Sequence, residues 1–112
     1  MAEQIFKFFT PTNIIFGPGA YNQVGNKLKT LKKEIVLIVT DPGLIKVGLP
    51  QSLKRNLEKE GLDVFIYDKI QANPTITNIN EGKEIVIEKK VQAVIGLGGG
   101  SSIDAAKSIS SL

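Results

Sequence analysis

The sequence predicts an α/β fold, a doubly wound and mainly parallel sheet with helices on both faces. Two observations support this class. The aliphatic runs at residues 35–39 and 91–97 contain almost no polar residues, which is typical of strands buried on both faces of a parallel sheet. Segments with helical spacing separate the strand candidates, and such alternation favours parallel strands joined by right-handed crossovers. We therefore expect these two runs to be neighbouring or near-neighbouring parallel strands, fully buried.

The first part of the chain predicts two short extended segments and a helix. Residues 5–9 and 13–16 are apolar and aromatic, and a Thr-Pro-Thr sequence between them indicates a turn. Apolar residues then recur at steps of three and four, which marks one face of an amphipathic helix. They are Tyr21, Val24, Leu28 and Leu31. The β-branched residues of the run 35–39 favour a strand over a helix, and a turn sequence, Asp41-Pro42-Gly43, follows it.

The next helix and strand have recognisable ends. Leu49, Leu53 and Leu57 have helical spacing. Pro50 suits a first helical turn and Gly61 a C-terminal cap. Residues 63–67 are the third strand candidate, with an apolar centre.

The last part of the chain predicts helix, strand and helix. The sequence Asn73-Pro74-Thr75 breaks the chain, after which Thr75, Thr77 or Asn78 can cap a helix that runs to about residue 90. Its inward residues are Ile79, Ile85 and Val86. Residues 91–97 are then the last strand and residues 102–112 the last helix.

A glycine-rich loop joins that strand to that helix. Gly98, Gly99 and Gly100 are followed by Ser101 and Ser102. Glycine lets backbone N–H groups approach a ligand with no Cβ in the way, and the helix start adds N–H donors and the positive end of its dipole. The loop therefore predicts a phosphate or pyrophosphate site.

A structural interpretation of this loop stays open beside the functional one. Ser101 and Asp104 have the spacing of a capping box, and glycine after a strand is often only a turn. Three consecutive glycines exceed what a turn needs and cost chain entropy. The loop is neither a P-loop, which needs Lys-Ser or Lys-Thr after its last glycine, nor a Rossmann fingerprint, whose acidic residue would lie beyond the end of this chain.

Other loops add polar residues at the same edge of the predicted sheet. Asp41 follows the run 35–39, and Asn73 lies beyond the strand candidate 63–67. Loops at the carboxyl ends of parallel strands line the ligand crevice of such sheets. Asp41, Asn73 and the loop 98–101 are therefore expected to converge.

Composition excludes several classes of function. The net charge of +3 comes from lysines spread along the chain, which argues against nucleic-acid binding. Cysteine is absent, which fits a reducing compartment and a cytoplasmic protein. No apolar run approaches the ~18 residues of a membrane span, and no signal-peptide pattern opens the chain. Histidine is also absent, so we expect no ordinary zinc site, no histidine base and no dehydrogenase activity from these residues alone.

Four motifs in order resemble the N-terminal domain of the iron-containing (group III) alcohol dehydrogenases, which include lactaldehyde reductase, 1,3-propanediol dehydrogenase and butanol dehydrogenase. The most specific is Gly98-Gly99-Gly100-Ser101-x-x-Asp104-x-x-Lys107. The other three are Pro11-x-x-Ile14-x-Phe16-Gly17-x-Gly19-Ala20, Val39-Thr40-Asp41-x-Gly43-Leu44 and Asn73-Pro74-Thr75. The resemblance covers the whole chain and implies a Rossmann-like domain of the dehydroquinate synthase type.

The resemblance also implies roles for individual residues. The glycine loop of the family holds the cofactor pyrophosphate, which implies that role for Gly98, Gly99, Gly100 and Ser101. The position of Asp41 faces the adenosine ribose, and that of Asn73 lies along the cofactor cleft. Asp104 would sit in the first turn after the loop, where capping is its expected role. NAD is the implied cofactor, with NADP the less favoured one.

The family binds Fe²⁺ or Zn²⁺ through one Asp and three His of a later, all-helical domain, which residues 1–112 do not contain. We expect these residues to be a truncated N-terminal dinucleotide-binding domain whose parent is a homo-oligomer acting on a small alcohol or aldehyde, with no membrane or nucleic-acid partner. Two alternatives stay open. One is a free-standing nucleotide-binding module without catalysis, and the other is a relative of glycerol dehydrogenase or dehydroquinate synthase.

Overall fold

A computed structural model of the chain describes residues 5–9, 14–16, 28–71 and 73–111. Five strands form one sheet: β1 (Ile5–Phe9), β2 (Ile14–Phe16), β3 (Ile35–Val39), β4 (Asp63–Tyr67) and β5 (Ala93–Gly98). Four helices accompany it: α2 (Pro42–Val47), α3 (Leu49–Lys59), α4 (Ile76–Lys89) and α5 (Gly100–Ser110). Residues 28–30 are also helical. Within the predicted amphipathic helix, Tyr21 and Val24 lie outside the described residues.

The sheet has the order β2-β1-β5-β3-β4 and is parallel in one half. Strand β3 pairs in parallel with β4 on one side and with β5 on the other. The predicted parallel pairing is therefore confirmed. All of β5 and all but the first residue of β3 are buried, but Val91 and Gln92 of the predicted run 91–97 precede the strand and are half-buried. Strand β1 pairs antiparallel with both β5 and β2. The two N-terminal segments therefore add an antiparallel edge to a parallel three-stranded core.

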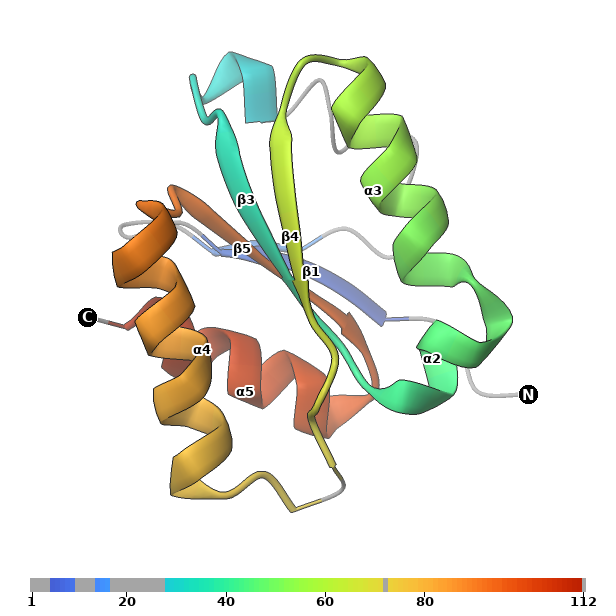
Figure 1. Cartoon of the computed structure of the whole chain (residues 1–112), viewed down its shortest axis with the longest axis vertical. Coiled ribbons are helices and arrows are strands. Elements are labelled where there is room, and N and C mark those ends of the chain that lie inside the picture. The colour runs from blue at the N-terminus through green and yellow to red at the C-terminus, as the bar shows by residue number, and fades with distance from the viewer. Residues whose placement is uncertain (1–4, 10–13, 17–27, 72, 112) are drawn as a thin grey trace.

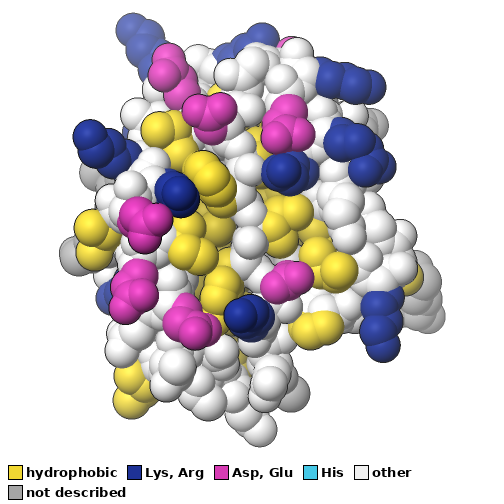
Figure 2. Space-filling model, viewed as in Figure 1, with side chains coloured by type: hydrophobic (Ala, Val, Ile, Leu, Met, Phe, Trp, Pro, Cys, Tyr) yellow, Lys and Arg dark blue, Asp and Glu magenta, His cyan; other side chains and the backbone are white. Residues whose placement is uncertain are grey.

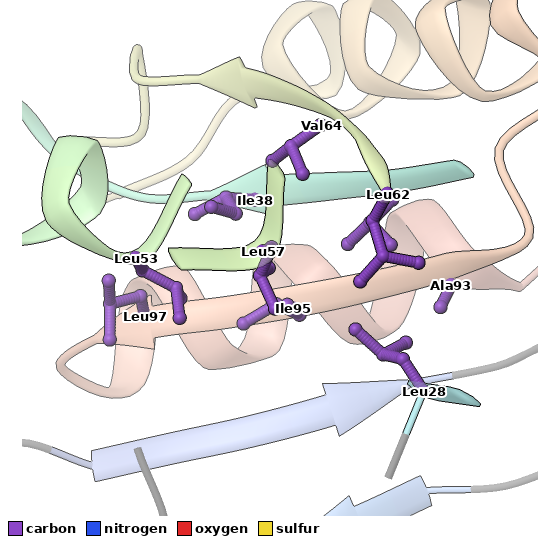
Figure 3. Packing of buried hydrophobic residues seen from close by; sticks show 10 residues of the cluster. Leu28, Ile38, Leu53, Leu57, Leu62, Val64, Ala93, Ile95 and Leu97 are labelled. Atoms are coloured by element: carbon purple, nitrogen blue, oxygen red, sulfur yellow. The ribbon is translucent and has the colours of Figure 1, made fainter. Parts of the chain in front are cut away.

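Helices cover both faces of the parallel strands, with α3 on one face and α4 and α5 on the other (Figure 1). Alternation along β3 divides the core into two clusters, because successive side chains of a strand point to opposite faces. Val36 and Ile38 pack against α3 through Leu53 and Leu57 (Figure 3). The other cluster contains Leu37 and Val39 of β3 together with residues of α4 and α5, among them Val86, Ile103 and Ile109. Each fully buried Leu or Ile contributes roughly 1.5–3 kcal/mol of hydrophobic free energy.

Two helix ends follow the sequence signals predicted for them. At the end of α3, Gly61 has a φ of +89°, and its N–H donates to the Glu58 carbonyl while the N–H of Leu62 donates to the Leu57 carbonyl. This is a Schellman motif. At the start of α4, the Thr75 side chain accepts from the Asn78 N–H and the Asn78 side chain accepts from the Thr75 N–H, which forms a capping box.

The structure corrects two local expectations. Residues 42–47 form helix α2, where the sequence indicated only a turn. Helix α5 begins at Gly100 rather than at Ser102, with Gly99 as its N-cap and no side-chain capping bond. The predicted capping box of Ser101 and Asp104 is therefore wrong. Gly98 turns the chain with a φ of +132°, so the helix starts early and Asp104 lies exposed in its second turn.

Strand β4 is an edge of the sheet, and charged side chains surround its apolar surface. Figure 2 shows hydrophobic side chains gathered along the middle of the face that the viewer sees, between Lys, Asp and Glu side chains. On β4, Phe65 and Ile66 are half-buried. The ammonium of Lys89 lies 5.5 Å from the centre of the Phe65 ring. A lysine over an edge strand protects it against pairing with another strand.

Gly82 is expected to be essential to the packing of α4 against α5. A Cβ at this position would overlap Cδ1 of Ile109 and lie 2.7 Å from its Cγ1, and Ile109 is fully buried. Overpacking costs about 1–3 kcal/mol, while alanine gains at most ~1 kcal/mol of helix propensity over glycine. We expect Gly82→Ala to lower the free energy of unfolding by about 1–2 kcal/mol in urea denaturation. Ile109→Val removes the Cδ1 atom that the new Cβ would overlap. In the Ile109→Val background, Gly82→Ala should therefore lower the free energy of unfolding by less than it does in the wild type. An equal loss in both backgrounds would contradict this explanation.

Candidate functional site

A hollow of about 230 Å³ lies where the predicted loops meet, beyond the carboxyl ends of β3, β4 and β5. Its lining residues are Asp41, Ile70, Gln71, Gly99, Gly100, Ser101 and Ser102. Pockets that enclose a drug-sized ligand measure about 300–1,000 Å³. The hollow is therefore large enough for part of a dinucleotide, such as a phosphate and a sugar, but not for the whole molecule.

The three glycines of the loop have different structural requirements. Gly98 needs to be glycine, because its φ is +132° and a Cβ would lie 2.8 Å from Oδ2 of Asp41. Gly99 has a φ of −84°, which any residue can adopt. A Cβ at Gly99 or Gly100 would meet no other group within 4 Å, although both residues line the hollow. The turn needs only Gly98, so the other two glycines leave the backbone open toward the hollow.

The N-terminus of α5 faces the same space. Gly100, Ser101 and Ser102 form its first turn, and all three line the hollow. The first N–H groups of a helix have no partner inside the helix, and no side chain caps α5 at its N-cap residue Gly99. These donors, with the positive end of the helix dipole, favour an anion.

Asp41 has a structural role and also lines the hollow. It is the N-cap of α2, where its Oδ1 accepts a 2.9 Å hydrogen bond from the Leu44 N–H. Its Oδ2 accepts a long hydrogen bond of 3.5 Å from Oγ of Ser102. The side chain is half-buried, so the carboxylate stays accessible to a ligand. The interpretation of Asp41 as a turn residue and its interpretation as a ligand-facing residue both fit this geometry.

Thr40 fixes the strand ends around the hollow. It is fully buried, and its Oγ1 donates a 2.8 Å hydrogen bond to the Leu97 carbonyl of β5. Its N–H donates to the Tyr67 carbonyl of β4, and its carbonyl accepts from the Ile70 N–H. Thr40 thus connects β3, β5 and the segment after β4. These hydrogen bonds fix the relative positions of the strand ends that border the hollow.

Tyr67 anchors the segment that leads from β4 to α4. Its hydroxyl donates to Oε1 of Glu81 at 2.5 Å and accepts from Nδ2 of Asn78 at 3.2 Å. Burial of the side chain, followed by the hydrogen bond to Glu81, raises the pKa of Tyr67 above its usual value. The phenol therefore stays protonated, and able to donate, at neutral pH.

The structure brings most of the predicted site residues together. Asp41, Gly99, Gly100 and Ser101 line the hollow, and Gly98 contributes the turn beneath Asp41. Asn73 lies on an exposed bend of the segment before α4 and is not part of the lining.

Sequence reasoning missed Ser102, Ile70 and Gln71 as lining residues. Ser102 could have been found if the helix start had been placed at Gly100, because it then falls in the first turn.

Some kinds of site are absent from the part of the chain that the structure describes. Within residues 5–9, 14–16, 28–71 and 73–111, no group of three or more His, Cys, Asp or Glu could hold a metal ion. In the same residues, no helix combines the length and the apolar character needed to cross a membrane.

Comparisons with known proteins all point to the same family. Residues 11–112 match the family described as iron-containing alcohol dehydrogenase. Alcohol dehydrogenase 4 of Schizosaccharomyces pombe is 40% identical over 111 residues, which are 99% of this chain and 26% of the relative. The NAD-dependent methanol dehydrogenase of Bacillus methanolicus is 39% identical over 102 residues, covering 91% of this chain and 27% of the relative.

A solved structure agrees with these relatives. NADH-dependent butanol dehydrogenase A of Thermotoga maritima superposes with a TM-score of 0.71 at 30% identity, over 89% of this chain and 25% of that one. The chain therefore spans about a quarter of the length of the relatives that it matches.

Proposed function

The chain belongs to the iron-containing alcohol dehydrogenase family, and on that premise we propose that it is the cofactor-binding part of a metal-dependent, NAD(P)-linked oxidoreductase. The whole protein would interconvert alcohols and aldehydes or ketones by hydride transfer. The chain corresponds to the N-terminal part of the family's proteins. Its own contribution would be to bind and orient the dinucleotide.

The observation that carries this proposal is the open backbone of Gly99 and Gly100 at the N-terminus of α5. A pyrophosphate in the hollow would accept hydrogen bonds from the first-turn N–H groups of α5. The carboxylate of Asp41 lines the same hollow and would accept hydrogen bonds from ribose hydroxyls. Anion donors and a hydroxyl acceptor on one small hollow fit the phosphate and the sugar of a nucleotide. We propose NAD as the preferred cofactor, and Asn73 as a residue further along the cleft.

The reactive end of the site would come from residues outside this chain. The family name implies iron, but the described residues offer no metal-binding cluster, and the sequence contains no His or Cys. We propose that Fe²⁺ or Zn²⁺ is held by a separate all-helical domain of the parent enzyme. The 112 residues alone would then bind nucleotide without turning over an alcohol. We also propose that the parent enzyme is a cytoplasmic homo-oligomer that acts on a small alcohol or aldehyde.

Gly99→Val tests the binding proposal. A valine side chain would enter the open hollow where the backbone should meet phosphate, and the φ of −84° at this position imposes no strain on it. We expect the NADH affinity of the chain to fall at least ~10-fold, which corresponds to about 1.4 kcal/mol. The free energy of unfolding should fall by about 0.5–1 kcal/mol, because valine is a poorer N-cap than glycine. Isothermal titration calorimetry and urea unfolding measure the two quantities.

A matched control separates blocking of the hollow from a general effect of valine on α5. Ser108 is exposed near the other end of that helix, so Ser108→Val should leave NADH affinity unchanged. If a folded Gly99→Val variant binds NADH as tightly as the wild type, the pyrophosphate does not lie on this loop.

A further inference from the structure

Ser102 has a buried hydroxyl group that donates to the carboxylate of Asp41 at the hollow. Among the described residues, Thr40 and Ser102 are the buried polar side chains. The hydroxyl of Thr40 makes a short structural bond to the Leu97 carbonyl. The hydroxyl of Ser102, 1% exposed as a residue, lines the hollow and reaches only as far as Oδ2 of Asp41, at 3.5 Å. The partner of this buried hydroxyl is therefore a carboxylate at the hollow rather than a backbone carbonyl.

Two hydrogen bonds orient the Asp41 carboxylate, a short one from the Leu44 N–H and a long one from Oγ of Ser102. Oδ1 of Asp41 is bound to the Leu44 N–H, and Oδ2 points toward Ser102. Gly98 makes room for this pair, because a Cβ there would lie 2.8 Å from Oδ2 of Asp41 and 3.3 Å from Oγ of Ser102. Both carboxylate oxygens therefore have a partner, and the side chain extends from the end of β3 across to the end of β5.

We propose that Ser102 is a specificity-determining residue that holds the Asp41 carboxylate at the hollow, so that it favours NAD(H) over NADP(H). This inference rests on the proposed function. A carboxylate held in place keeps its negative charge close to the ribose, where it repels a 2′-phosphate more strongly than a charge that can turn toward solvent. Without the hydroxyl of Ser102, Oδ2 loses its hydrogen-bond partner among the described residues of the hollow and can turn outward. Ser102 therefore acts through Asp41, as a positioning residue.

A merely structural role of Ser102 predicts a different result. Loss of helix packing would weaken the binding of both cofactors alike, because both share the pyrophosphate and the adenosine. A positioning role changes the ratio of the two dissociation constants, and it does so only while residue 41 carries a charge. The ratio, and its dependence on Asp41, is thus the readout that separates the two roles.

The experiment is a double-mutant cycle on the 112-residue chain, with NADH and NADPH titrated by calorimetry. For Ser102→Ala we expect the ratio of the NADPH to the NADH dissociation constant to fall three- to tenfold. The same substitution in an Asp41→Asn background should leave the ratio unchanged. Ser110→Ala is the matched control, because Ser110 lies on the same helix and donates to the Lys107 carbonyl, away from the hollow.

The outcomes separate this inference from the proposed function. If the wild type binds NADH more tightly than NADPH and Ser102→Ala keeps the same ratio, the role of Ser102 is refuted and the proposed function stands. An equal change of the ratio in the Asp41→Asn background also refutes it, because the effect would not pass through the carboxylate. If the folded wild type binds neither nucleotide, the proposed function fails and this inference fails with it.

Discussion

Gly98→Ala is expected to lower the free energy of unfolding by about 2–4 kcal/mol, since positive-φ strain and overpacking each cost about 1–3 kcal/mol. The backbone of Gly98 has a φ of +132°, and an added Cβ would lie 2.8 Å from Oδ2 of Asp41 and 3.3 Å from Cδ1 of Leu44. Relief of the contact requires Asp41 to move, which would also disturb the hydrogen bond that caps α2. Urea unfolding followed by circular dichroism measures the loss.

Gly100→Ala is the matched comparison, because it changes the same loop without these conflicts. Its Cβ would meet no group within 4 Å, and the residue lies in the first turn of α5. Alanine should therefore keep or slightly raise stability, by at most ~1 kcal/mol. The added Cβ would still narrow the hollow that Gly100 lines. If Gly98→Ala proves as stable as Gly100→Ala, the special conformation of Gly98 is not a structural requirement.

The core of the fold could be predicted because its signals are local. The run 35–39 is aliphatic in every position and forms β3, the middle strand of the three parallel strands. Leu53 and Leu57 lie one helical turn apart and are both buried in α3. Gly61 adopts the positive φ that glycine tolerates after a helix, and Thr75 caps α4 through its side chain. In each case the residue type has one strong conformational preference, and the contacts in the folded protein are compatible with that conformation.

The direction of the first two strands and the starts of two helices depend on the chain's surroundings, and the sequence could not define them. The alternation with helices that predicted parallel pairing for the later strands is absent between the first two segments, so β1 and β2 were predicted only as extended segments, without a direction. The sequence Asp41-Pro42-Gly43 suits a turn and a helix start equally well, which explains why α2 was missed. The start of α5 depends on the φ of Gly98, which no residue pattern reveals.

The candidate site also combines features that the sequence defines with features that depend on the fold. Asp41 and the loop 98–101 could be placed together, because loops at the carboxyl ends of parallel strands share one edge of the sheet. Ser102 was missed, since its burial follows from the early start of α5. The same rule about strand ends also placed Asn73 at this edge, but Asn73 does not line the hollow, and its role along the cleft is a proposal from the resemblance.

Asp41→Asn is expected to reduce the preference for NAD(H) over NADP(H), expressed as the ratio of the two dissociation constants, by about 10- to 100-fold. Like charges ~4 Å apart repel by on the order of 4 kcal/mol at an effective dielectric near 20. Asp41 is half-buried, so solvent screening brings the expected discrimination down to about 1.4–2.8 kcal/mol. Asparagine caps helices as well as aspartate does and keeps an oxygen for the Leu44 N–H. The substitution therefore removes the charge and leaves the fold of α2 intact.

The deciding measurement is the ratio of the dissociation constants for NADPH and NADH, compared between the wild type and Asp41→Asn. The expected change is asymmetric. NADPH should bind more tightly to the variant because the repulsion of its 2′-phosphate is gone, while NADH should bind somewhat more weakly because a neutral amide accepts weaker hydrogen bonds from ribose hydroxyls than a carboxylate does. An exposed carboxylate away from the hollow, Asp104, gives the control, since Asp104→Asn changes the net charge equally without facing the ribose. A wild type that already favours NADPH, or a ratio that does not move in Asp41→Asn, would mean that Asp41 serves only as the cap of α2.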